Sequence, residues 1–248
     1  SIDAYAEARA AIAQVPEPAR TRDMQELDAR ARIAEAREIA RTRRNAGDRA
    51  AAIAVLESVE PLALVHVDRA RDVAYGWIEL DESERALRTF APYLQEERAH
   101  ETSVQLAWAE ILNAAEDPRL EATLASLRAE PQLKPEERQT VARLQRAFEL
   151  RTVRSLQRAG AYEAAAAKLD ALLAADPEDR ALRVAQADLA LSRNQIRVAR
   201  DRYAALVAED PDDLDTRLSY VRALTADRSR DLALAQLEYV IERAPAED

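Results

Sequence analysis

The sequence predicts an all-α fold in which short antiparallel helix pairs are laid side by side as a solenoid. Residues that favour helices dominate, and only 3 glycines and 10 prolines interrupt the 248 residues. These breakers return on a schedule: 34 residues separate Gly160 from Asn194 and Pro177 from Pro211. One helix pair is too short to be stable alone, so neighbouring pairs must cover its apolar face.

The last hundred residues give the clearest order of elements. A helix is predicted between Gly160 and Pro177, a second between Pro177 and Asn194, and Pro211 closes the next unit. Three apolar columns keep the same spacing: small Ala165, Ala199 and Ala233; larger Leu169, Tyr203 and Leu237; and Leu172, Leu206 and Val240. The alanines suit a close helix crossing, and the larger residues fill the adjacent groove.

Each breaker has an expected role. Gly160 ends the first helix of a pair in a left-handed backbone conformation, which Asn194 also tolerates. Arg228 fits that role poorly, so its turn is expected to be built differently. Each proline is expected to stop one helix and start the next, with the preceding Asp176 or Asp210 as N-cap.

Looser copies of the unit precede this region, giving about six repeats in all. The first is recognised by the residues Gly47, Ala52, Leu56 and Pro61. In the second, a first helix at about 64–80 leads to a second helix with Ala86 and Phe90. The third spans 102–131, with Trp108 on its first helix and a turn at Asp117-Pro118.

Two predicted helices exceed one repeat's allotment. Residues 134–159 read as one helix starting at Pro135, or as two short units joined without a break, and 23–45 look similarly long. A coiled coil is disfavoured because breakers interrupt the heptads too often. The whole chain, 1–248, is thus expected to be a single solenoid. Its predicted parts are an N-terminal helix and proline-containing linker (1–22), degenerate repeats (23–133), and the long helix with three regular repeats (134–248).

Bulk composition excludes several classes of function. A net charge of −10 argues against a general nucleic-acid binder. The absence of cysteine excludes disulfides and thiolate chemistry, and no apolar run is long enough to cross a bilayer. The chain begins without methionine, and its last helix, 231–244, is apolar nearly all round. Both features lead us to expect a piece of a longer protein, with more repeats following.

No catalytic, cofactor-binding or metal-ligating residue is predicted, and the chain is not expected to be an enzyme. His66 and His100 have no partner at ligand spacing; we expect His66 near a helix start and His100 as a solvated cap. The acidic run at 210–215 suits a helix N-terminus. Trp77 and Trp108 are expected in the helix core rather than as a sugar-stacking platform.

A 34-residue helix–turn–helix unit with these residues resembles the tetratricopeptide repeat. The match in one copy is Gly160, Tyr162, Ala165, Leu169 and Pro177; in the next it is Ile196, Ala199, Tyr203 and Pro211. Arg183 and Arg217 occupy the position where the family usually has tryptophan, so the individual copies are degenerate. The resemblance implies a right-handed superhelix whose first helices line a concave groove that binds a protein partner.

Positions five and nine of that repeat identify the residues expected on the concave surface. The charged and aromatic ones, with Arg158 one turn further on, are Arg37, Arg41, Arg71, Tyr75, Arg154, Arg158, Asp188 and Arg222. Arginines beside a tyrosine could grip an acidic peptide by bidentate hydrogen bonds, or simply pair with neighbouring glutamates. The chaperone-tail clamp of some tetratricopeptide proteins needs lysine and asparagine at these positions, and neither is present.

Residues 133–179 also resemble a stretch of cellulose synthase operon protein C and related exopolysaccharide exporters. The matching residues are Arg138-Gln139 in reversed order, Arg151, Arg154, Gly160, Tyr162, Ala165, Asp176 and Pro177. That resemblance implies a periplasmic scaffold beside an outer-membrane barrel, holding polysaccharide synthase or modifying enzymes, with weak polymer contact possible. Exporters of Pel and of poly-N-acetylglucosamine are equally open. The alternative is a stand-alone bacterial adaptor, in the cytoplasm, that binds a peptide or partner protein.

Overall fold

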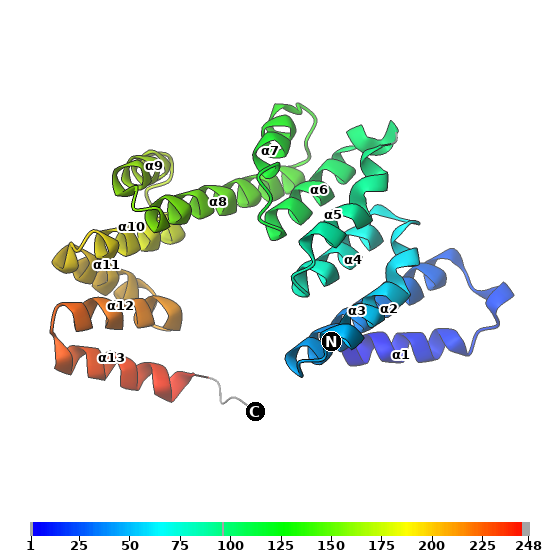
Figure 1. Cartoon of the computed structure of the whole chain (residues 1–248), viewed down its shortest axis with the longest axis horizontal. Coiled ribbons are helices and arrows are strands. Elements are labelled where there is room, and N and C mark those ends of the chain that lie inside the picture. The colour runs from blue at the N-terminus through cyan, green and yellow to red at the C-terminus, as the bar shows by residue number, and fades with distance from the viewer. Residues whose placement is uncertain (1, 96, 245–248) are drawn as a thin grey trace. The chain divides into compact units, whose positions relative to one another are not determined.

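A computed structural model describes residues 2–95 and 97–244, and every regular element in those ranges is a helix (Figure 1). The chain divides into two compact units, unit 1 (residues 1–148) and unit 2 (residues 149–248). Within each unit, consecutive helices pack against one another as neighbours. The predicted all-α fold of paired helices is therefore confirmed.

The helices follow the expected order. Unit 1 contains α1 (Ile2–Ala13), α2 (Arg22–Asn45), α3 (Arg49–Ala63), α4 (Val67–Glu79), α5 (Ser83–Phe90), α6 (Thr102–Ala114) and α7 (Leu120–Ala129). It also contains short 3₁₀ turns at Glu17–Ala19, Ala91–Leu94 and Glu97–His100. Helix α8 (Pro135–Arg158) spans the boundary between the units. Unit 2 continues with α9 (Tyr162–Ala175), α10 (Arg180–Ser192), α11 (Ile196–Glu209), α12 (Leu214–Ala226) and α13 (Arg230–Arg243).

One turn closes every helix pair. The pairs α2/α3, α4/α5, α6/α7, α8/α9, α10/α11 and α12/α13 each contain one residue of positive φ: Gly47, Asp81, Glu116, Gly160, Asn194 and Arg228. In each turn the next residue's N–H donates to a carbonyl five residues back at 2.8–2.9 Å, as from Ala161 to Leu156. This is the Schellman motif, which satisfies carbonyls that a helix end leaves without partners.

The expectation of a different turn at Arg228 is wrong. Its φ is +62°, its N–H donates to Thr225, and Ser229 N–H donates to Leu224 at 2.9 Å. A left-handed non-glycine residue costs about 1–2 kcal/mol. The two hydrogen bonds and the packing of α12 against α13 hold the arginine backbone in that conformation.

The predicted N-caps are also wrong. Asp176 and Asp210 end α9 and α11 with non-helical backbones, at φ of −144° and −137°, because the residue before a proline is disfavoured in a helix. The actual caps are Asp179 and Asp213, whose carboxylates accept from the N–H three residues on. Each proline thus begins the connecting turn, and the next helix begins three residues after it.

Pro61 departs from its expected role as well. It lies inside α3, which continues to Ala63, so it does not close the repeat. Pro61 removes one N–H donor, but the helical backbone continues past it to Ala63. The two overlong helices are present as predicted: α2 runs unbroken over Arg22–Asn45, and α8 is a single helix that starts at Pro135.

Most residues of the apolar columns lie in the cores, although Leu237 of the last copy is exposed. Ala165, Ala199 and Ala233 are all buried, as are Leu169 and Tyr203. In unit 1, Trp77 and Trp108 are buried and belong to the core cluster. Trp108 stacks on Phe90 with ring centroids 5.8 Å apart. The expectation that both tryptophans are core residues is confirmed, and the alanine column marks the close helix crossings.

A polar brace joins three helices of unit 2. Arg180 of α10 donates from Nη1 to the Leu206 carbonyl of α11 at 2.9 Å, and from Nη2 to Asp213 at 2.8 Å. Asp213 also accepts from the hydroxyl and N–H of Thr216. Burial raises the pKa of Asp213, but the Thr216 bonds and Arg180 outweigh it and lower that pKa to about 2. The start of α12 is thereby fixed against the preceding pair.

We expect Arg228→Gly to stabilise the protein by about 0.5–1 kcal/mol, because glycine relieves the left-handed strain and loses only part of the gain to unfolded-state entropy. Urea denaturation followed by circular dichroism measures the change. Ala235→Gly, at an exposed interior position of α13, is the control and should cost about 1 kcal/mol. Loss of stability in Arg228→Gly would contradict the assigned turn.

We expect Asp213→Asn to cost about 1 kcal/mol at pH 7, because asparagine still caps α12 but loses the charge facing Arg180. The folded-state pKa lies below the ordinary 3.8, so the carboxylate stabilises above pH 4 and that contribution disappears as pH falls toward 2. The difference from wild type should therefore narrow over that interval in urea titrations. Asp215→Asn, exposed in the same first turn, is the control. A difference independent of pH would contradict the role of the charge.

Candidate partner-binding face

The first helices of successive pairs touch one another, so each unit has a face made from first helices. In unit 1 this face is formed by α2, α4 and α6, and in unit 2 α10 contacts α12. The eight residues singled out from the sequence all lie on first helices: α2, α4, α8, α10 and α12. The structure brings them together in two groups, which differ in how their charges are compensated.

In unit 1 the predicted arginines are paired within the chain. Arg37 of α2 donates to Glu79 of α4, and its guanidinium lies 5.8 Å from the Tyr75 ring centroid. Arg41 forms an ion pair with Glu38 one turn earlier. A groove of about 140 Å³ between α2 and α4 is lined by Ala34, Arg37, Glu38, Arg41 and Glu79. Its walls therefore carry both signs of charge.

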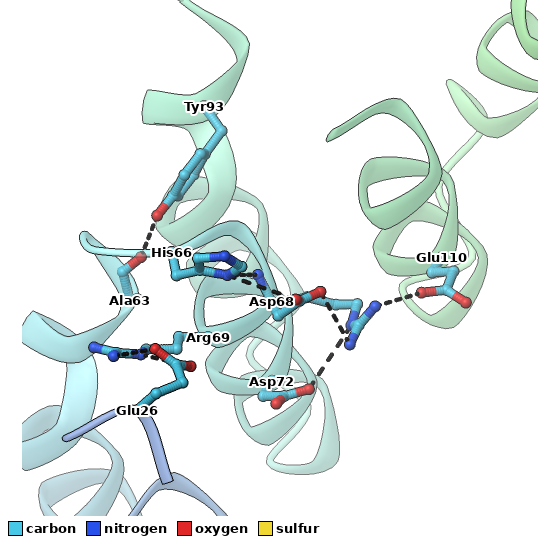
Figure 2. A network of polar contacts seen from close by, with 9 residues as sticks. Glu26, Ala63, His66, Asp68, Arg69, Asp72, Tyr93 and Glu110 are labelled. Carbon is cyan, nitrogen blue, oxygen red and sulfur yellow. Dashed lines mark hydrogen bonds and ion pairs between the residues drawn. The ribbon is translucent and has the colours of Figure 1, made fainter. Parts of the chain in front are cut away.

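Arg71 of α4 sits among three carboxylates. Figure 2 shows Asp68, Asp72 and Glu110 around this guanidinium, at 3.4, 3.7 and 3.4 Å. Glu110 of α6 also accepts from Arg143 of α8 at 3.2 Å. Arg71 thus braces α4 against α6. The predicted arginines of unit 1 pair with carboxylates of the chain itself.

Titration in this group follows from burial. Burial raises the pKa of the Asp72 carboxyl, with Arg71 and Arg37 acting in the opposite direction. Burial also raises the pKa of Tyr75, and the negative charge of Glu110 adds to it. The tyrosine therefore stays neutral and serves as a half-buried surface for Arg37.

A second set of contacts, also drawn in Figure 2, joins α2 to α4 and the turn after α5 to α3. Arg69 pairs with Glu26 of α2, whose pKa the Arg69 hydrogen bond lowers. Tyr93 donates its hydroxyl to the Ala63 carbonyl at 2.7 Å. His66 lies at the helix start as expected, where its Nδ1 accepts from Asp68 N–H at 3.3 Å. The expectation of a cap at His100 is wrong, because α6 begins after Glu101 without a side-chain cap.

In unit 2 the predicted residues form one column. Arg154 of α8, Asp188 of α10 and Arg222 of α12 are spaced by the repeat, and an apolar column lies one turn earlier on the same helices: Leu150, Val184 and Leu218. The apolar column is partly buried, whereas both arginines are exposed. This face therefore presents alternating charges beside an apolar stripe.

Asp188 is held from behind by a tyrosine. It accepts from the hydroxyl of Tyr203 on α11. Burial raises the pKa of Tyr203, as do the bond to Asp188 and that carboxylate's charge, while Ser219 and the charge of Arg222 act in the opposite direction. Asp188, Tyr203 and Arg222 thus form one electrostatic group contributed by three successive helices.

The arginines of this face have no carboxylate partner in the part of the chain that the structure describes. Arg158 donates from Nε to the Arg154 carbonyl at 3.4 Å, and both side chains are exposed. Arg222 is exposed on α12 without an ion pair within residues 2–95 and 97–244. These arginines thus differ from Arg37, Arg41 and Arg71, whose carboxylate partners lie in the chain itself.

The sequence analysis did not predict the contacts that Arg183 and Arg217 make with the second helix of their own pair. These arginines occupy the position where tryptophan is usual in the repeat. Arg183 of α10 forms a two-pronged contact with Glu209 of α11. Arg217 is buried; it donates to the Pro211 carbonyl at 2.7 Å and stacks on Tyr239 with its guanidinium 3.7 Å from the ring centroid. Their 34-residue spacing was the available signal, because it places both at the same crossing of first and second helix.

No part of the described structure offers a metal-binding or membrane-spanning element. Within residues 2–95 and 97–244 there is no group of three or more histidine or acidic side chains placed to hold a metal ion. None of the helices in those ranges is both long and apolar enough to span a bilayer. The polar groups that do converge on each face are ion pairs and helix caps.

Comparison with known proteins finds similarity in solved structures alone. No protein-family model matches the sequence, and no protein of curated function matches it significantly. The chain is similar to the crystal structure of TTC0263, a thermophilic TPR protein in Thermus thermophilus, with 20% identity and a TM-score of 0.41. That similarity covers 78% of this chain and 99% of TTC0263. The comparisons give no support to the resemblance to cellulose synthase operon protein C, which stays a prediction.

Proposed function

We propose that this chain is a non-catalytic scaffold of the tetratricopeptide type that binds an acidic, extended segment of a partner protein. The binding face is the first-helix face of unit 2, formed by α8, α10 and α12. The observation that carries this proposal is the set of exposed arginines without carboxylate partners in the described residues, Arg154, Arg158 and Arg222, beside the apolar column Leu150, Val184 and Leu218.

The two units differ in what binding would cost. An acidic ligand on unit 1 must compete with Glu79 for Arg37 and with Glu110 for Arg71. On unit 2 no carboxylate of residues 2–95 and 97–244 forms an ion pair with Arg154, Arg158 or Arg222, so a ligand carboxylate would displace none. Bidentate contacts between arginine and carboxylate are among the stronger hydrogen bonds in proteins. The proposal therefore assigns recognition to unit 2 and bracing to the arginines of unit 1.

The partner's composition follows from the two columns. Carboxylates would face Arg154 and Arg222, a donor would face Asp188, and apolar side chains would lie on the neighbouring stripe. The protein as a whole carries a net charge of −10, so its long-range field opposes an acidic partner. Affinity must then come from close contacts. Salt screens both the long-range repulsion by the net charge and the attraction between the arginines and the ligand carboxylates.

We expect a fluorescein-labelled nonapeptide of alternating glutamate and leucine to bind the full chain, measured by fluorescence anisotropy. Replacing Arg154, Arg158 and Arg222 by glutamine should weaken binding at least about tenfold, which corresponds to roughly 1.4 kcal/mol. The double variant Arg37→Gln and Arg41→Gln is the matched control and should bind like wild type. A glutamine–leucine peptide tests the role of charge. Equal affinity of both variants would contradict the assignment to unit 2.

A finer proposal is that this scaffold works in the periplasm as part of an exopolysaccharide export protein for a cellulose-like polymer, with synthase or modifying enzymes as partners. It is supported by the resemblance over residues 133–179, whose long helix and following turn match α8 and Gly160. The competing proposal is a stand-alone bacterial adaptor in the cytoplasm, which the same face would serve equally well.

Cell fractionation separates these two alternatives. For the export protein, we expect the native protein in the periplasmic or envelope fraction, and we expect its deletion to abolish secretion of the polymer. The measurements are immunoblotting of the fractions and Congo red staining of colonies. Recovery in the cytosol with unchanged polymer would reject the export role and favour the adaptor.

A further inference from the structure

We propose that Asp188 makes the first-helix face of unit 2 selective for an acidic segment that carries one basic residue between its carboxylates. This inference rests on the proposed function, because it adds a requirement on the ligand of the same face. The charged column there consists of Arg154, Asp188 and Arg222, one residue from each of three successive first helices. Its electrostatic complement on an extended ligand is a cation with a carboxylate on either side.

The carboxylate of Asp188 is held in place without being neutralised. It accepts a hydrogen bond from the hydroxyl of Tyr203 on α11, and the Tyr203 side chain is fully buried. A neutral hydroxyl fixes the direction of the carboxylate but brings no charge that offsets it. Within residues 2–95 and 97–244, no basic side chain forms an ion pair with Asp188. Because part of the Asp188 side chain stays exposed, a ligand cation can reach it.

The bracing carboxylates of unit 2 differ from Asp188 in this respect. Asp213 accepts from Arg180 of α10 at 2.8 Å. Asp227 accepts from Arg200 of α11 at 2.7 Å. Each of these carboxylates meets a cation of the chain itself, and each ties one helix to another. The charge of Asp188 is instead left to a ligand, as are the charges of the two arginines in its column.

The arginines of the column attract the flanking carboxylates without excluding the cation. Helix α10 packs against α8, where Val153 shares a core cluster with Leu182, and it also contacts α12. The axes of packed helices lie about 8–10 Å apart, so Arg154 and Arg222 project from about that distance on either side of Asp188. Physiological salt screens charges over about 8 Å, whereas a cation in contact with Asp188 is attracted at short range.

The backbone of an extended ligand suits this spacing. Alternate side chains of an extended segment point to the same face, and about 6.6 Å separates them along the chain. Carboxylates two or four residues before and after the basic residue therefore lie within reach of the long arginine side chains.

Two isomeric peptides test the requirement at constant net charge. Both are labelled nonapeptides of alternating glutamate and leucine; lysine replaces the central glutamate in one and the first glutamate in the other. Titrated against the full chain and followed by fluorescence anisotropy, the central-lysine peptide should bind about three- to fivefold tighter, the effect of one partly exposed ion pair. Only this isomer places a carboxylate on each side of the cation. The net charge of −10 on the protein acts equally on both peptides.

The variant Asp188→Asn separates selectivity from binding itself. Asparagine still accepts the Tyr203 hydroxyl through its side-chain carbonyl, so the fold is retained and only the charge is lost. We expect the two isomers to bind this variant equally. Asp170→Asn is the matched control and should keep the wild-type preference, because Asp170 is exposed on the second helix α9. Circular dichroism of both variants confirms that the fold is retained.

The outcomes distinguish this inference from the proposed function. Equal affinity of the isomers for the wild-type chain, or a preference that survives in Asp188→Asn, would overturn the selectivity. The proposed function would stand in that case if both isomers still lose affinity when Arg154, Arg158 and Arg222 are replaced by glutamine. If neither isomer nor the all-glutamate peptide binds the wild-type chain, the proposed function fails and the selectivity fails with it.

Discussion

The structure depends on one backbone constraint, a single left-handed residue between the two helices of every pair. With positive φ at that residue, two N–H groups turn back onto the end of the first helix and satisfy its carbonyls. The chain reverses within a few residues, so the second helix is delivered alongside the first. The close helix crossings at alanine and the exposed faces of first helices both depend on this reversal.

Since the reversal has the same geometry each time, what varies between repeats is the side chains laid on it. The step from Glu116 to Gly160 is the longest between successive turns, and the extra length lies in α8. Elsewhere the spacing is kept at 34 or 35 residues, so equivalent positions face equivalent neighbours. This explains why Asp179 and Asp213 both cap first helices, and why Arg183 and Arg217 both reach the second helix of their own pair.

The sequence predicted the helix pairs because glycine and asparagine announce a left-handed residue. It misjudged Arg228 because arginine carries no such signal, although its turn makes the same two backbone hydrogen bonds as the turns at glycine and asparagine. The N-caps were misplaced for a related reason: proline restricts the residue before it, but where the next helix starts is decided by Asp179 and Asp213 downstream. Short-range rules thus identified each helix, but the position of proline alone did not locate the side chain that caps the start of the next helix.

On the candidate face, too, the sequence predicted the position of residues but not their contacts. Spacing alone placed Arg37, Arg71, Arg154 and Arg222 on first helices, but it could not say which of them meet a carboxylate. Glu79 lies 42 residues from Arg37, and Glu110 lies 39 from Arg71, distances that only the stacking of neighbouring pairs closes.

An arginine whose carboxylate is supplied by the next pair is committed to the stack, and an arginine without one is left to the solvent or a ligand. The unequal distribution of carboxylates, rather than of arginines, therefore distinguishes the bracing face from the binding face.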